Sequence, residues 1–206
     1  MQPHDPTTAL LALLGEVLAH PDAGTRSRLG HFTRLAAATP NAAAAAEAFC
    51  AEVRDLSLDA LGEIYTRTFD VMPSCVPYLS VHLFGEESFH RARLMSGLHE
   101  ALHAARVDAR GELPDHLAVV LRAAPALDPD LWADLVDFVV RASLHAMSEL
   151  LATTDNPYRH LLRATQILVG PPTDEDLARL AAARRAPPTS ASGPCAVGPE
   201  DVAGGR

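Results

Sequence analysis

The sequence predicts an all-α protein, and three observations point to this class. Apolar residues recur at intervals of three and four along most of the chain, as in the run Leu10, Leu11, Leu14 and Leu18. No segment combines two-residue alternation with β-branched residues, the pattern that predicts a strand. Pro, Gly, Asp and Asn fall between the apolar segments, where helices begin and end. We therefore expect a single-domain bundle of about ten helices.

The first half of the chain predicts five helices. Asp5 and Ser57 are the expected N-caps of the first and fourth, and Asn41 is the expected N-cap of the Ala-rich third. Pro73 and Pro77 interrupt the helical pattern and predict a turn. The expected helices cover residues 6–20, 25–38, 41–55 and 57–69, followed by a short helix that ends at Leu83.

The second half predicts five more, at residues 86–106, 115–124, 130–153, 156–169 and 174–185. Asp115 and Asp174 are the expected N-caps of the second and the last. The helix over 130–153 is apolar around most of its circumference, so we expect it to be central and buried.

Composition divides the chain into three parts. Residues 1–170 form the expected helical domain, and residues 171–186 form a short helical extension. Residues 187–206 are rich in Pro, Gly and Ser without periodicity, which predicts a disordered C-terminal tail.

The charge balance restricts the kind of partner. A net charge of −9 disfavours nucleic-acid binding and favours a basic partner. The N-terminal residues lack the positive charge of a secretory signal, and no segment approaches the about 18 apolar residues of a membrane-spanning helix. We therefore expect a soluble, cytoplasmic protein that does not insert into the membrane.

Cysteine usage agrees with a reducing compartment. The three cysteines, Cys50, Cys75 and Cys195, are an odd number without a C-x-x-C pair, so they do not form a disulfide framework. The spacing of Cys75, His82 and His90 matches no closed zinc site.

One segment matches a zinc-enzyme pattern. His99-Glu100-Ala101-Leu102-His103 fits H-E-x-x-H, in which two histidines on one helical face bind zinc and the glutamate is the general base. The extended pattern needs a glycine and a third histidine where this chain has Arg106 and Ala109. Because no third ligand follows, a zinc hydrolase is the disfavoured alternative, and we expect no catalytic residue, metal or cofactor.

Two segments concentrate residues suited to recognition. In the stretch 61–87, aromatic, acidic and imidazole side chains gather at the Pro-broken junction, and Tyr78 and His82 share a face if their segment is helical. The later segment 111–117 holds an acid and an imidazole at a helix start. The candidate site residues are Tyr65, Phe69, Asp70, Tyr78, His82, Glu86, Asp115 and His116.

These segments resemble a known family. The Tyr65-x-x-x-Phe69-Asp70 motif with Pro73 and Tyr78-Leu-Ser-Val-His82, then Gly111-Glu-Leu-Pro-Asp115-His116-Leu117, then Asn156-Pro157-Tyr158, are similar in order and spacing to the NarJ (delta subunit) assembly chaperones of respiratory nitrate reductase. The resemblance covers about residues 8 to 170. It identifies the chain as similar to the all-helical TorD-like chaperones for molybdoenzymes.

The resemblance implies a chaperone without chemistry of its own. Such a protein binds the N-terminal segment of the apo catalytic (alpha) subunit, keeps it competent for insertion of the molybdenum cofactor, and leaves before the enzyme is complete. We expect a monomer. Alternatives are a chaperone for a dimethyl sulfoxide, selenate or chlorate reductase, and a purely structural helical subunit. The resemblance leads us to expect an acid where this chain has Arg122, which alters one electrostatic contact of the second motif.

The candidate residues suit capture of a basic, amphipathic segment. Aromatic side chains supply apolar contact area, and Asp70, Glu86 and Asp115 are expected to pair with client Arg or Lys. His82 and His116 are expected to make the affinity sensitive to pH near neutrality. Tyr65 and Phe69 fit a core role as well as a site role.

Overall fold

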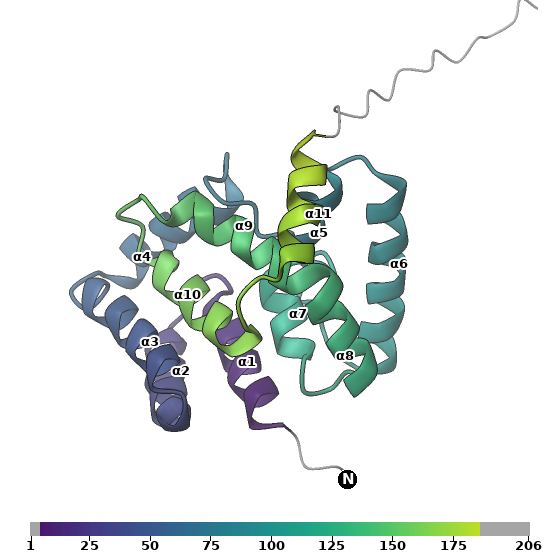
Figure 1. Cartoon of the computed structure of the whole chain (residues 1–206). Helices are drawn as coiled ribbons and strands as arrows, with labels where there is room; N and C mark the ends of the chain where they lie inside the picture. The colour runs from purple at the N-terminus through teal and green to yellow at the C-terminus, as the bar shows by residue number, and fades with distance from the viewer. Residues whose placement is uncertain (1–4, 186–206) are drawn as a thin grey trace, which may run out of the picture.

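Helices account for the regular structure of the computed structural model, which describes residues 5–185 (Figure 1). Within this range there is no strand, only an isolated bridge between Tyr78 and His116. The elements are α1 (Pro6–Val17), α2 (Thr25–Leu35), η1 (Ala36–Ala38), α3 (Pro40–Glu52), α4 (Leu58–Tyr65), η2 (Thr66–Asp70), α5 (Leu79–Phe84), α6 (Phe89–Ala104), α7 (Leu117–Ala123), α8 (Pro129–Leu135), η3 (Val136–Val140), α9 (Arg141–Leu151), α10 (Tyr158–Val169) and α11 (Asp174–Arg185). The all-α prediction is confirmed.

Two predicted caps are present as expected. The Asp5 carboxylate accepts a hydrogen bond from the Thr7 N–H at 2.9 Å and starts α1. The Ser57 hydroxyl accepts from the Ala60 N–H at 3.1 Å and starts α4. In both cases a short polar side chain satisfies an N–H group that has no partner inside the helix.

Three predicted helix starts are wrong by one or a few residues. α3 begins at Pro40 with Thr39 as N-cap, because proline at the first helical position sacrifices no hydrogen bond, so Asn41 lies inside the helix. α6 begins after Ser88, whose hydroxyl accepts from the His90 N–H, and not at Glu86.

The start of α11 differs in the same way. The Thr173 hydroxyl accepts from the Asp176 N–H at 3.2 Å, and the Asp176 carboxylate accepts from the Thr173 N–H at 2.8 Å. This reciprocal pair is a capping box. Asp174 is therefore the first residue of the helix and not its cap.

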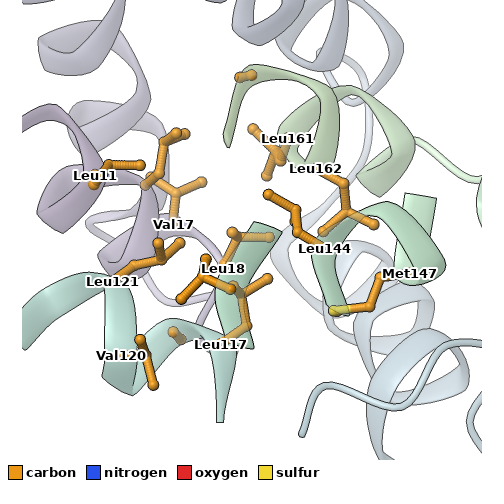
Figure 2. Close-up of a cluster of buried hydrophobic side chains, with 14 of the residues drawn as sticks. Leu11, Val17, Leu18, Leu117, Val120, Leu121, Leu144, Met147, Leu161 and Leu162 are labelled. Carbon is orange, nitrogen blue, oxygen red and sulfur yellow. The ribbon is translucent and has the colours of Figure 1, made fainter. Parts of the chain in front are cut away.

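The core lies where α1 crosses α7 and where α10 lies between α3 and α9. Figure 2 shows leucines of α1 and α7 facing leucines of α9 and α10. Gly15 of α1 permits the close crossing, because a Cβ there would lie 2.7 Å from the Ala118 carbonyl oxygen of α7. α2 and α3 form one end of the molecule, and α6 forms the opposite end (Figure 1).

The long helix predicted over 130–153 is present as the continuous series α8, η3 and α9. Its second half is buried as expected, with Leu144, Met147 and Leu151 almost fully covered. Its first half is buried on one side only, because Leu135 and Val139 are each 6% exposed, whereas Leu131 is 37% exposed and Phe138 is 55% exposed. The expectation of burial is therefore wrong for one side of α8 and η3, and α8 extends along the edge of the molecule (Figure 1).

α11 packs against α9 and α5. Its Asp176 is fully buried and forms ion pairs with Arg141 (2.9 Å) and Arg179 (2.5 Å). The tail predicted at 187–206 lies outside the described residues. Among the helices of residues 5–185, none is long and apolar enough to cross a membrane.

Candidate functional site

The two segments singled out in the sequence lie side by side. Tyr78 and His116 form an antiparallel bridge. The Leu79 N–H donates to the Asp115 carbonyl at 2.9 Å, and the Leu117 N–H donates to the Pro77 carbonyl at 2.9 Å. The rings of Tyr78 and His116 meet edge to face, with centroids 5.6 Å apart. The start of α5 and the start of α7 are thereby fixed to each other.

The buried side chain of Asp115 connects the start of α7 to α5 and α6; we call this contact region the Asp115 junction. The Asp115 side chain is fully buried, and Oδ2 accepts a hydrogen bond from the Ser80 hydroxyl of α5. Arg91 of α6 lies 3.8 Å from the same oxygen and donates to Ser80 at 3.0 Å. Asp115 is therefore not the N-cap of α7, which is His116, whose Nδ1 accepts from the Ala118 N–H at 3.1 Å. The predicted contact of Asp115 with a client stays a prediction, and its burial favours a positioning role.

The third family motif, Asn156-Pro157-Tyr158, contacts the first motif through a cluster of aromatic rings. Tyr65 and Phe69 contact Tyr158 of α10, with ring centroids 5.8 and 5.2 Å away, and Phe49 of α3 also contacts Tyr158 at 5.3 Å. Phe69 is only 4% exposed, so it lies in the core. Asn156, just before α10, donates to the Thr68 hydroxyl at 2.6 Å.

A π-helical turn places neighbouring residues on opposite sides. η2 continues α4, and its wider turn leaves Phe69 buried while Asp70 is exposed. Such turns interrupt regular helices frequently at functional sites. The chain then leaves through Val71 and Met72, which are 68% and 93% exposed, and Met72 has a positive φ of 48°.

Asp70, Tyr78 and Glu112 form what we call the acidic rim. Asp70 and Glu112 are exposed, and Tyr78 is partly buried. Burial raises the pKa of Tyr78, and the negative charges of Glu112, Asp115 and Asp70 raise it further. Sequence reasoning missed Glu112, although its place beside Asp115 in the loop before α7 was a usable signal.

A cavity of about 210 Å³ adjoins the acidic rim at Glu112, which forms part of its lining. It brings together Tyr65 of α4 and His116, both among the candidate residues. Its lining also includes the charged or imidazole side chains of Glu16, His20, Asp22, Arg28, Arg110, Glu112 and Arg122. A larger cavity of about 480 Å³ between α9 and α10 contains none of the candidate residues, so size alone does not identify the site.

Burial lowers the pKa of both candidate histidines. Burial, with a smaller effect of the Arg122 charge, lowers the pKa of His116 to about 4. Burial also lowers the pKa of His82, partly offset by its hydrogen bond to the Val76 carbonyl. The expectation that His116 makes the affinity sensitive to pH near neutrality is therefore wrong, because its ring is neutral at pH 7. The lowered pKa of His82 argues in the same direction, and its role stays a prediction.

Within residues 5–185, neither His82 nor Glu86 forms a hydrogen bond or ion pair with a residue of the acidic rim, although the Glu86 carbonyl accepts from Arg91 at 3.2 Å. The Nε2 of His82 is 2.9 Å from the Val76 carbonyl oxygen, and the charge that influences it is that of Arg184 in α11. Glu86 is exposed in the turn after Gly85. Their predicted roles in client binding remain predictions, without support from proximity to Tyr78.

The zinc pattern lies on an exposed part of α6. His99, Glu100 and His103 are all exposed. Within residues 5–185, no group of three or more His, Cys, Asp or Glu side chains is arranged to hold a metal ion.

Comparison with known proteins gives one match. The family model described as nitrate reductase delta subunit matches residues 33–164. The matched range includes the acidic rim, Asp115 and the aromatic residues that surround Tyr158. Helices α1 and α11 lie outside it. No curated protein and no solved structure matches the chain. Because the model covers well over half of the sequence, the chain belongs to the nitrate reductase delta subunit family.

Proposed function

We propose that this chain is a chaperone that binds the apo catalytic subunit of a membrane-bound molybdoenzyme, respiratory nitrate reductase, and assists insertion of the molybdenum cofactor and assembly of the complex. Membership of the delta subunit family supports an assembly role. The Tyr78–His116 bridge is the observation that carries the proposal, because it joins two separate motifs into one surface. The proposed client segment is the N-terminus of the catalytic subunit, bound in the cytoplasm by a monomer.

The chemistry of this surface fits a basic, amphipathic segment. The carboxylates of Asp70 and Glu112 are exposed and suit pairing with Arg or Lys of the client. Val71 and Met72 offer exposed apolar contact beside them, and a methionine adapts to different partners. Tyr78 adds an aromatic face with a polar hydroxyl. An amphipathic helix laid along this surface uses both kinds of contact.

Calorimetry with a peptide of the catalytic subunit's N-terminal segment tests this proposal. The double variant Asp70→Asn with Glu112→Gln removes two exposed charges, so we expect about tenfold weaker binding and an unchanged melting temperature. Asp134→Asn on α8 removes an equally exposed carboxylate elsewhere and is expected to bind as the unaltered chain does. Equal affinity of all three proteins would exclude the acidic rim from the site.

A second measurement addresses cofactor insertion and the identity of the client. Molybdenum content is measured in the catalytic subunit expressed with and without this chain, and we expect it to fall when the chain is absent. Peptides from dimethyl sulfoxide, selenate and chlorate reductases, measured in parallel, decide between nitrate reductase and these related clients. Full cofactor loading without the chain would contradict the proposed role.

A further inference from the structure

Arg122 is a partly buried cation without an ion-pair partner among residues 5–185. Its Nε donates to the Ala118 carbonyl at 3.2 Å, and Nη2 lies 3.5 Å from the Ala109 carbonyl. The other two arginines of the cavity are committed: Arg110 forms two hydrogen bonds with Glu16, and Arg28 pairs with Asp22 at 2.5 Å. A guanidinium is always charged at neutral pH. Arg122 is therefore a cation of the cavity that has no carboxylate within ion-pair distance among residues 5–185, and the charges of Glu16, Asp108 and Glu112 act on it only from farther away.

Two further side chains of the cavity offer hydrogen-bond donors. Tyr65 and His116 are each only 2% exposed as residues and both line the cavity. No hydrogen bond of the Tyr65 hydroxyl or of His116 Nε2 is formed within residues 5–185, and neither atom belongs to the fully enclosed atoms that lack a partner, so both remain accessible from the cavity. Because Nδ1 of His116 accepts from the Ala118 N–H, the single proton of the neutral ring lies on Nε2. Burial raises the pKa of Tyr65 above its ordinary value, so its hydroxyl keeps its proton.

We propose that this cavity binds a carboxylate, that of an acidic side chain in the client segment, with Arg122 as the cation and with the Tyr65 hydroxyl and His116 Nε2 as donors. The inference rests on the proposed function, since it names a feature of the segment that the chaperone recognises. A carboxylate bound in the cavity would accept hydrogen bonds from both donors and pair with the cation at the same time.

Size and charge favour a side chain over a larger ligand. A volume of about 210 Å³ lies below the roughly 300–1,000 Å³ of pockets for drug-sized ligands, and it suits a side-chain carboxylate. Glu112 is the remaining acid at the cavity, but it is exposed, so solvent and salt screen its repulsion. The acidic rim outside and Arg122 inside therefore select a segment with basic residues flanking an acidic one.

The test is a calorimetric cycle with the N-terminal peptide of the catalytic subunit. Each Asp or Glu of the peptide is replaced in turn by Asn or Gln, and we expect one replacement to weaken binding about tenfold. Arg122→Gln is expected to weaken binding of the unaltered peptide by a similar factor and to have no further effect on the replaced peptide. Tyr65→Phe, which removes only the hydroxyl from a packed ring, is expected to weaken binding severalfold.

Arg163→Gln on α10 is the matched control, because Arg163 is exposed and lies at the other cavity. It is expected to leave the affinity unchanged. If the unaltered peptide binds but neither the acidic replacements nor Arg122→Gln change its affinity, the carboxylate site is overturned while the proposed function stands. A client segment without acidic residues overturns it as well. If the unaltered chain binds no peptide at all, the proposed function itself fails.

A further titration distinguishes a cavity that binds a client side chain from one that binds a small free carboxylate. Sodium acetate and sodium glutarate are titrated while the His116 ring is observed by NMR. We expect no saturable shift at submillimolar concentration, because a small free acid lacks the contacts of the acidic rim. Tight binding of either salt at His116 would assign the cavity to a free carboxylate and overturn its assignment to the client.

Discussion

Tyr78 and His116 are paired across an antiparallel bridge, with their rings at 80° to each other. Helices α5 and α6 and the loop before α7 connect these two residues along the chain. The bridge therefore joins the two ends of this connecting segment. The position of the acidic rim depends on the contacts at these two ends, above all those of Asp115.

Asp115→Ala is predicted to destabilise the protein by about 2–3 kcal/mol. The change leaves the buried Ser80 hydroxyl without its acceptor and removes the carboxylate that faces Arg91. Arg91 is 19% exposed and can turn partly toward water, which keeps the expected loss below that of a fully buried pair. Urea unfolding followed by circular dichroism measures the loss, with exposed Asp134→Asn as control. An unchanged midpoint would mean that Asp115 does not hold the junction.

Gly15→Ala is predicted to destabilise the fold by about 1–3 kcal/mol through overpacking. Its Cβ would lie within 3 Å of backbone atoms of both Ala118 and Arg122, and backbone cannot move aside as a flexible side chain can. α1 and α7 would have to separate.

Gly97→Ala is the matched control in α6, where an added Cβ meets nothing within 4 Å. Alanine has the higher helix propensity, so this variant is predicted to be more stable by about 0.5–1 kcal/mol. Equal effects of the two substitutions in thermal unfolding would contradict the close crossing.

Helix positions were predictable because their signals are local. Asp5 and Ser57 cap the helices they precede, whatever the remainder of the fold does. Local signals fail where a side chain bonds to a residue far away in the sequence instead of to its own helix. The Asp115 carboxylate accepts from Ser80 of α5, and His116 is therefore the N-cap of α7. The exposure of Phe138 was unpredictable for a related reason, since periodicity shows an apolar row but not whether another helix covers it.

The candidate site was predictable by residue type more than by location. Tyr78 and His116 were chosen from separate segments, and the structure brings them into contact. His82 was chosen from its spacing to Tyr78, but Tyr78 precedes α5 in an extended conformation, so helical spacing does not apply. Glu16 and Arg110 reach the cavity from segments far apart in the sequence, and no pattern in the sequence indicates that meeting.

Tyr65→Ala is predicted to cost about 3–5 kcal/mol of stability, because it removes a buried ring from the aromatic cluster. Tyr65→Phe keeps the ring and removes a hydroxyl without a partner in the described chain, so its stability is predicted to change by less than about 1 kcal/mol. Thermal unfolding of both variants measures the difference. A large loss in Tyr65→Phe would show that the hydroxyl has a structural partner.

Stability is predicted to fall as the pH drops from about 6.5 to about 4, owing to His116. The pKa of the folded-state imidazole is about 4 and its ordinary value is 6.5, so in this range the unfolded chain binds more protons than the folded chain does. The difference corresponds to about 3 kcal/mol, fully lost below the folded-state pKa. The lowered pKa of His82 acts in the same direction.

His116→Asn isolates this contribution, because asparagine can still accept the Ala118 N–H as an N-cap but does not titrate. Urea unfolding between pH 7.5 and pH 4 is predicted to show a smaller loss in this variant than in the unaltered chain. His99→Asn changes an exposed histidine of α6 and is predicted to leave the pH profile as it is. A His116 ring resonance that titrates near pH 6.5 would contradict this prediction. The pKa of the ring would then be the same in the folded and the unfolded state, and His116 would not make the stability depend on pH.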